Sequence, residues 1–311
     1  MPFNAVWALG YSQKYTNGNG INVASESELI AAVRAIFETS LPADERIIVG
    51  IGDDAAVISQ PKGKVALATD IAVEGVHFNR SWSSLFEIGA KITAANLADI
   101  YAMGGVPEFL LVAAALPAGF TVPEIEELAR GIVDEASKVG ARVVGGDLAA
   151  SHSLVVTIAV YGSVKEPILR SGAQVGDLVI ISDLPGASAA GFALLKQDIS
   201  DERTQAHLRP IVNYIAARDF ALAGVSSMSD ISDGLVSELL HISQASGVGI
   251  EIRTDEVIDF HGGEDHVFVA TISPRLPFPR QAIEIGKVVL GKGVRVNGEP
   301  AVHLGFKHFL E

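Results

Sequence analysis

Short apolar segments with strand character alternate with longer amphipathic segments along most of this chain. Residues 46–49, 55–59 and 65–68 are strand-like and separated by Gly and Asp, whereas apolar residues recur at helical spacing across 85–103. Helices packed on a sheet are the ordinary fold of a chain with this alternation. The sequence therefore predicts an α/β architecture, and no tandem repeat favours a solenoid.

Residue signals at segment ends locate further elements. Ser25 and Glu28 have the spacing of a capping box, in which each side chain accepts a backbone N–H, so a first helix is predicted to begin there. Gly145-Gly146-Asp147 is interpreted as a turn between two strands. Further helices are predicted at 123–139, 187–195, 210–223 and 232–245, and further strands at 109–116, 142–144, 154–161 and 178–182.

The chain is long enough, at 311 residues, for two domains that each bury a core. The alternation pauses near 162–167, so we expect an N-terminal α/β domain over 23–165 and a C-terminal α/β domain over 166–311. Residues 1–22 are predicted to be a flexible extension. A single large α/β domain is the alternative.

Composition excludes several kinds of site and partner. Without cysteine, the chain has no disulfide, thiolate zinc site or cysteine nucleophile. A formal charge of −14 disfavours nucleic acid as a partner. The apolar runs are shorter than the roughly 20 residues of a membrane helix, and the first residues lack the pattern of a signal peptide. We therefore expect a cytoplasmic protein with no membrane partner.

Aspartates concentrate in Gly-rich or small-residue segments rather than on exposed helix faces. They are Asp53, Asp54, Asp70, Asp99, Asp147, Asp230 and Asp233. Carboxylate oxygens are the ligands that Mg²⁺ prefers, and a cation offsets the repulsion between unpaired carboxylates in nonpolar surroundings. Each aspartate alone is more often a helix cap or turn residue. As a set, they indicate a divalent-metal site that could mediate between an acidic protein and an anionic nucleotide.

Other residues carry weaker individual signals. Arg170 could brace a phosphate with its planar guanidinium, or it could form a surface salt bridge. His77 could hydrogen-bond a substrate, although a lone histidine is more often structural. The Gly-rich turns could approach a phosphate closely, but the chain has no Walker-type loop and no convincing dinucleotide-binding glycine motif.

In their order along the chain, these segments resemble the thiamine-monophosphate kinases, a family of the aminoimidazole-ribotide-synthetase-like ATP-binding superfamily. The resemblance runs from about Glu26 to the C-terminus and depends on residues 52–56, 69–70, 73–78, 96–107, 145–147, 170–173, 230–235 and 262–265. It implies two α/β domains, of which the first binds ATP and Mg²⁺ and has a mixed sheet with helices on one face. It also implies a homodimer that uses ATP and several Mg²⁺ ions to phosphorylate thiamine monophosphate to thiamine diphosphate.

The same resemblance implies roles for individual residues. It implies metal ligands at Asp54, Thr69, Asp70, Asp99, Asp147, Asp230 and Asp233, with Asp53 as a supporting carboxylate. It implies nucleotide contacts at Gly146, Asp147, Arg170 and Ser232, and substrate contacts at His77, Glu264 and Phe306. The expected catalytic residues among these are Asp99, Asp233 and Arg170. Because phosphoryl transfer mainly needs alignment and charge neutralisation, and the acceptor phosphate is already ionised, no strong general base is expected.

The sequence also departs from the family pattern. Ala68 stands where relatives often carry a hydroxyl side chain, Asp183 replaces a usual glycine, and the 251–261 connection is short. Two alternatives stay open, namely another ATP-using enzyme of the superfamily and a non-catalytic Mg²⁺–nucleotide-binding protein. Selenophosphate synthetase is disfavoured because its Cys or selenocysteine has no counterpart here.

Overall fold

The N-terminal half is built on a four-stranded sheet with strand order β3-β6-β4-β5. The computed structural model describes residues 24–59, 63–253 and 262–301, so the predicted extension at 1–22 lies outside it. β4 and β5 are parallel, and the other neighbouring strands are antiparallel. The strands are β3 (Lys64–Val73), β4 (Val106–Pro117), β5 (Arg142–Ser151) and β6 (Val155–Val164).

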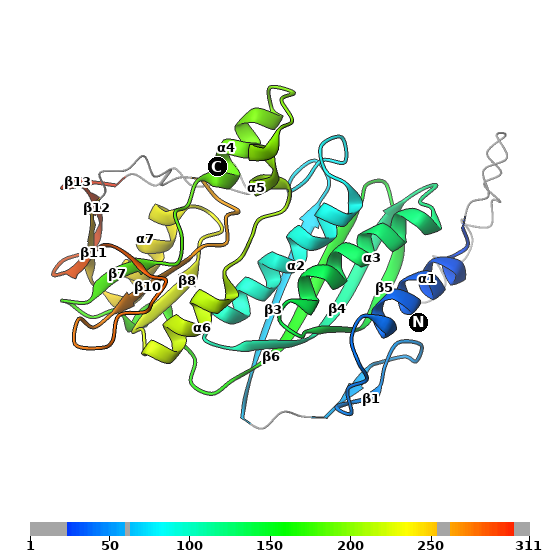
Figure 1. Cartoon of the computed structure of the whole chain (residues 1–311), viewed down its shortest axis with the longest axis horizontal. Helices are drawn as coiled ribbons and strands as arrows, with labels where there is room; N and C mark the ends of the chain where they lie inside the picture. Colours follow the sequence, from blue (N-terminus) through cyan, green and yellow to red (C-terminus); the bar gives the residue numbers. More distant parts are fainter. Residues whose placement is uncertain (1–23, 60–62, 254–261, 302–311) are drawn as a thin grey trace, which may run out of the picture.

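Three helices cover one face of this sheet, and they are α1 (Glu26–Thr39), α2 (Leu85–Ala102) and α3 (Val122–Ser137) (Figure 1). In β6, buried residues such as Ile158 alternate with partly exposed ones, as expected for a strand with one covered face. The opposite face carries Leu67 and Ile71, which are 74% and 56% exposed. The predicted mixed sheet with helices on one face is confirmed.

Helix α2 is buried along most of its length because it contacts the N-terminal sheet on one side. On the other side it contacts β8 (Ser227–Asp230), α5 (Gln205–Leu208) and α6 (Tyr214–Ala223). Its close crossing with α3 requires glycine on both helices. A Cβ at Gly89 would lie 2.3 Å from the Leu128 carbonyl oxygen, and one at Gly131 would lie 2.0 Å from that of Phe86. The helix therefore joins the two halves of the molecule at a fixed position.

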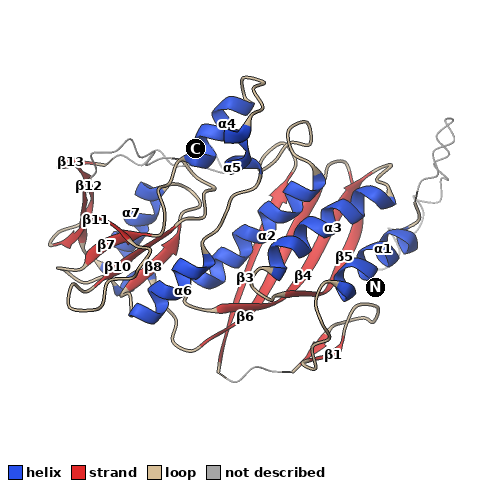
Figure 2. Cartoon of the chain, in the orientation of Figure 1, coloured by secondary structure: helices blue, strands red, loops and turns tan. Residues whose placement is uncertain are grey.

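The C-terminal half contains a seven-stranded sheet with strand order β13-β12-β9-β11-β7-β10-β8. Helices α6 (Tyr214–Ala223) and α7 (Leu235–Ser246) pack on opposite faces, because Phe268 of β10 shares a core with Phe220 and Val269 shares one with Leu239. Helices α4 (Ala187–Leu195) and α5 (Gln205–Leu208) lie together above the sheets in Figure 2. The strands are β7 (Leu178–Ile181), β8 (Ser227–Asp230), β9 (Gly249–Ile252), β10 (Phe268–Ile272), β11 (Ile283–Val289), β12 (Gly293–Val296) and β13 (Glu299–Pro300).

Several predicted elements are confirmed and others are wrong in extent. The Ser25–Glu28 capping box begins α1, and α4 has the predicted bounds. Gly145-Gly146-Asp147 lies inside β5 instead of forming a turn. The glycine at 146 serves a close contact between strands, because a Cβ there would lie 1.9 Å from the Val112 carbonyl oxygen of β4. The helix predicted from residue 210 begins only at Tyr214, after an Asn213 cap.

The predicted domain boundary near 165 falls at the end of β6 and stays a prediction. In the described ranges, no helix combines the length and the apolar character that crossing a membrane requires.

Candidate active site

Three carboxylates from distant parts of the chain converge between the two halves. Asp70 lies on β3 facing α2, and its backbone N–H donates to Asn96 Oδ1 at 3.0 Å. Asp99 lies on α2, and Asp230 ends β8. Burial, with the negative charges of Asp230 and Asp70, raises the pKa of Asp99 to about 7. Burial also raises the pKa of Asp70, and Asp230 adds to the effect. The three side chains therefore repel one another where water screens them poorly.

A buried histidine partly offsets this negative charge. His266 Nδ1 lies 3.3 Å from Asp230 Oδ2, and both side chains are 6% exposed. Burial alone would lower the pKa of His266, but the hydrogen bond and charge of Asp230, with Glu264, outweigh burial and raise it. Sequence reasoning missed His266, although it directly follows the predicted substrate residue Glu264 and Asp265.

The donor set suits a magnesium ion in chemistry. In the part of the chain that the structure describes, no group of three or more His, Asp or Glu side chains forms a ready-made metal site. However, Asp70, Asp99 and Asp230 are carboxylates whose mutual repulsion a divalent cation would remove. These three residues therefore fit the ion that the sequence predicts.

The Asp230–Gly234 segment and the 262–266 segment pack against each other. The Glu264 backbone N–H donates to the Ser232 carbonyl oxygen at 2.8 Å, and a Cβ at Gly263 would lie 2.2 Å from that oxygen. Ser232 and Asp233 lie just before α7, whose first residue is Leu235. The structure thus places a predicted nucleotide residue, Ser232, beside a predicted substrate residue, Glu264.

Arg170 is held by residues that the sequence did not indicate. Its Nε donates to Ser229 Oγ at 3.1 Å and its Nη2 donates to Glu238 Oε2 at 3.2 Å. Glu238 is buried on α7, and Ser229 Oγ also donates to it at 2.8 Å. The Arg170 charge is close enough to act on Asp99, where it lowers the pKa. Arg170 therefore presents an anchored positive charge beside the carboxylates.

His77 lies close to Asp70 of β3. Its Nδ1 accepts a hydrogen bond from the Val73 backbone N–H at 3.1 Å, which orients the ring. The ring is close enough to Asp70 for its electrostatic effect to lower the pKa of that carboxyl. The predicted substrate residue His77 therefore lies near a predicted metal ligand.

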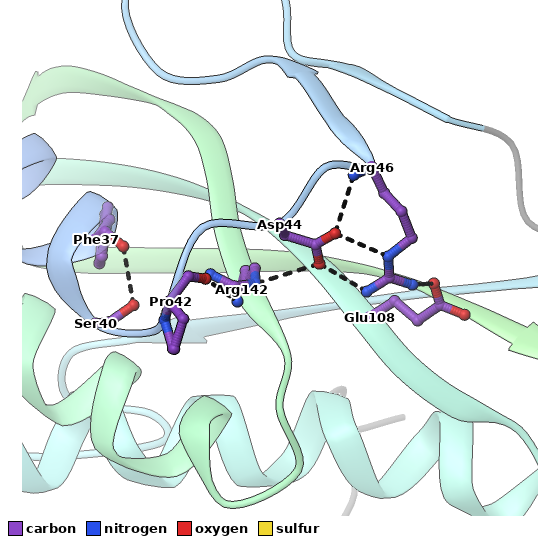
Figure 3. A network of polar contacts seen from close by, with 7 residues as sticks. All are labelled: Phe37, Ser40, Pro42, Asp44, Arg46, Glu108 and Arg142. Atoms are coloured by element: carbon purple, nitrogen blue, oxygen red, sulfur yellow. Dashed lines mark hydrogen bonds and ion pairs between the residues drawn. The ribbon is translucent and has the colours of Figure 1, made fainter.

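Asp53 and Asp54 lie in the loop between β1 (Ile47–Val49) and β2 (Val57–Ile58). Both are exposed, and Asp53 Oδ1 accepts from the Asp54 backbone N–H at 3.0 Å. A polar network holds the start of this hairpin against the sheet (Figure 3). Asp44 pairs with Arg46 at 2.8 Å and with Arg142 of β5 at 3.3 Å, and Arg46 also pairs with Glu108 of β4 at 2.5 Å.

The hydrogen bond from Arg46 holds the pKa of Asp44 at about 2, despite partial burial. Asp44 is therefore a carboxylate at any physiological pH, and the network keeps its charge. These ion pairs attach the β1–β2 hairpin, which carries Asp53 and Asp54, to strands β4 and β5.

Thr69 and Asp147 lie on the open face of the four-stranded sheet, away from the three buried carboxylates. Asp147 of β5 lies in the same row across the sheet as Ile71 of β3, with one residue each of β4 and β6 between them. Thr69 is two residues from Ile71 on β3, so the side chains of Asp147 and Thr69 share a face. Thr69 Oγ1 donates to the Ile158 carbonyl oxygen at 3.0 Å, and Asp147 Oδ1 accepts from the Leu148 backbone N–H at 3.0 Å. In one copy of the chain, the predicted metal ligands thus divide between two faces. Phe306 lies outside the described residues.

The sequence matches two known domain families and the proteins that contain them. Residues 52–164 match the domain described as AIR synthase related protein, N-terminal domain, and residues 174–274 match AIR synthase related protein, C-terminal domain. A thiamine-monophosphate kinase from Mycobacterium tuberculosis is 34% identical over 278 residues, which cover 81% of this chain and 83% of that protein.

Solved structures agree with the sequence matches. Thiamine-monophosphate kinase from Stenotrophomonas maltophilia has a TM-score of 0.78 at 26% identity, covering 89% of this chain and 98% of that one. AaThiL complexed with AMPPCP and TMP has a TM-score of 0.75 at 30% identity, covering 91% of this chain and 97% of that one.

Proposed function

Because this chain belongs to the thiamine-monophosphate kinase family of AIR synthase related proteins, we propose that its aspartates hold magnesium for phosphoryl transfer from ATP. The activity is the ATP-dependent phosphorylation of thiamine monophosphate to thiamine diphosphate. Its two substrates correspond to the two ligands of the AaThiL complex, an ATP analogue and TMP.

The observation that carries the metal proposal is the convergence of Asp70, Asp99 and Asp230 at one buried place. Carboxylates that raise one another's pKa need a positive charge to stay ionised at neutral pH. Bound magnesium would neutralise the transferring phosphoryl group and bridge it to the protein. Arg170 supplies positive charge beside the same carboxylates, and His266 lies 3.3 Å from Asp230.

The positions of the side chains support the following residue roles. Arg170, anchored by Glu238, contacts the nucleotide phosphates, and Ser232 adds a polar contact to the nucleotide. Asp233 lies one residue on and completes the catalytic set with Asp99 and Arg170. Gly146 and Asp147 on β5, with Asp54 supported by Asp53, form a second group of nucleotide and metal contacts, separated in one copy of the chain from Asp70, Asp99 and Asp230 by the sheet. Glu264 and His77 contact thiamine monophosphate.

We also propose a homodimer through the open face of the four-stranded sheet. Val65, Leu67, Ile71 and Leu111 are exposed on this face, and a second copy would remove their apolar surface from water. Thr69 and Asp147 would then lie at the interface. Sedimentation at low concentration tests the assembly, and a monomer would contradict it. A cytoplasmic location agrees with ATP as co-substrate.

One experiment tests the activity and the metal together. The purified protein with MgATP and thiamine monophosphate should form thiamine diphosphate, and chelation with EDTA should stop the reaction. Magnesium with AMPPCP should also raise the thermal midpoint, because both bind only the folded protein. Nucleotide binding without product at saturating magnesium would favour a non-catalytic binding protein instead.

A further inference from the structure

Helix α2 carries a buried lysine that the proposed mechanism does not use. Lys91 is 9% exposed, on a helix that is buried along most of its length. Its Nζ donates to Glu264 Oε2 at 3.1 Å and lies 3.5 Å from His207 Nε2. The three residues come from α2, the 262–266 segment and α5, so they join three separate parts of the fold at one point.

The charges in this cluster are complementary. Burial raises the pKa of Glu264, but the positive charge of Lys91 is the largest of the opposing effects and the net pKa is lowered, so the carboxylate is ionised. Burial and the charge of Lys91 lower the pKa of His207 to about 4. Neutral His207 can therefore accept from Lys91 through Nε2 and donate from Nδ1 to Ser188 Oγ, 3.1 Å away.

Accessibility separates the two members of the ion pair. The side chain of Lys91 is 11% exposed, whereas that of Glu264 is 36% exposed. A ligand can reach the carboxylate but is screened from the ammonium group. Glu264 also has a positive φ of 61°, an uncommon backbone conformation for this residue type, in a segment packed on Ser232. The backbone conformation of Glu264 and the ion pair with Lys91 thus together set the direction of its side chain.

The cluster also fixes helix α4 over this region. The Phe192 ring stacks on His207 with 4.8 Å between centroids, and Trp82 meets Phe192 edge-on at 6.0 Å. Lys196 Nζ lies 4.1 Å from the centroid of the same Phe192 ring. The α4–α5 pair is therefore packed onto α2 through the residues that surround Lys91.

We propose that Lys91 is a positioning residue that holds the Glu264 carboxylate in the orientation that binds thiamine monophosphate, with neutral His207 fixing the ammonium group. This inference rests on the proposed function of Glu264 as a substrate contact. A structural role alone explains the lysine poorly, because replacing buried ion pairs by apolar residues often leaves stability unchanged or higher. An ionised, accessible carboxylate instead suits the cationic, amine-bearing thiamine group.

The test uses Lys91→Met, which removes the charge and keeps the length of the side chain. We expect KM for thiamine monophosphate to rise about tenfold or more, with KM for MgATP changed less than about twofold, as for loss of one charged contact. Calorimetric titration of thiamine monophosphate, with magnesium and AMPPCP present, should show the same loss of affinity. Lys64→Met is the matched control, because Lys64 forms an exposed ion pair with Glu166, and it should behave as wild type.

Glu264→Gln should show the same selective loss, and combining it with Lys91→Met should add little further, since both changes remove one shared contact. Lys91→Gln, which keeps a polar side chain at the buried position, carries the same expectation if Lys91→Met does not fold. Unchanged acceptor affinity in a folded Lys91 variant, or an equal rise in both KM values, would overturn the inference. Wild-type binding of thiamine monophosphate without turnover would instead refute the kinase proposal alone.

Discussion

Asp265 Oδ1 accepts a hydrogen bond from the Ser188 backbone N–H at 2.8 Å, across 77 positions of the sequence. Asp265 Oδ2 accepts from the Gly186 backbone N–H at 2.7 Å. Gly186 is the N-terminal cap residue of α4 and has no side chain of its own to satisfy these donors. The side chain that caps α4 is therefore supplied by the same segment that carries Glu264 and His266.

Replacing this capping carboxylate should destabilise the protein. Asp265→Ala leaves two amide donors without their acceptor, and we expect unfolding to become easier by about 1–2 kcal/mol, measured by urea denaturation. Asp183→Ala is the control, because Asp183 is exposed and accepts a hydrogen bond from the neighbouring Leu184 backbone N–H at 2.8 Å. A control that loses as much stability as Asp265→Ala would argue against the cap.

Asp99→Asn should strongly reduce turnover without harming the fold. Burial and the charges of Asp230 and Asp70 raise the pKa of Asp99 to about 7, which means that the Asp99 carboxylate is unfavourable in the metal-free fold. Asn removes that charge, so the metal-free protein should keep or increase its thermal midpoint. Misplacing a metal should reduce kcat by about 10²-fold or more. Steady-state kinetics at saturating magnesium check this, with Asp201→Asn on the exposed surface as a control. Near-normal kcat in Asp99→Asn would contradict the metal role.

His207 should make stability depend on pH. Its pKa falls from an ordinary 6.5 to about 4 in the folded protein, so the unfolded chain binds more protons between these values. The stability from neutral His207 is present above pH 6.5 and is lost as pH falls toward 4. We expect a loss of about 2 kcal/mol between pH 7 and 4.5, absent in His207→Gln, from urea denaturation at both pH values.

The exposed His152 supplies the matched control for this experiment. His152→Gln should keep the pH dependence of the wild type, because it leaves His207 and its contacts unchanged. Parallel pH profiles for wild type and His207→Gln would show that burial of His207 has no such effect.

A buried hydroxyl links α6 to α3. Tyr214 Oη donates to Glu135 Oε1 at 2.8 Å, and Lys138 Nζ donates to the other carboxylate oxygen at 2.5 Å. Tyr214→Phe should cost about 1–3 kcal/mol, because the buried carboxylate loses a donor that water cannot replace. Thermal and urea denaturation measure the change. Tyr161→Phe, with a partly exposed ring packed on Phe109, should change stability by less than about 0.5 kcal/mol.

Local signals predicted the fold where the deciding contacts are local. The Ser25–Glu28 capping box spans one helical turn, and the bounds of α4 follow from flanking small and polar residues. Asp147 was misplaced for the opposite reason. Gly145 and Gly146 have the appearance of a turn, but Gly146 serves close contact with Val112 in a strand distant along the chain.

The site was predictable where residue type alone suggests chemistry. Asp70, Asp99 and Asp230 were expected as ligands, and the structure brings them together. Lys91 was missed because a lysine on a helix is normally solvent-exposed, and its partner Glu264 is 173 positions away. Glu238 was missed in the same way, since only the folded chain places it beside Arg170.

The adjacent residues Thr69 and Asp70 point to opposite faces of β3, one toward the open sheet surface and the other toward α2. Insertion or deletion of one residue in this strand would exchange every side chain between the two faces. The buried carboxylate would move to the surface, and an apolar neighbour would take its place. Insertions and deletions among natural relatives should therefore be absent from β3 itself, including its positions that contact no ligand, and should fall in the segments that flank this strand.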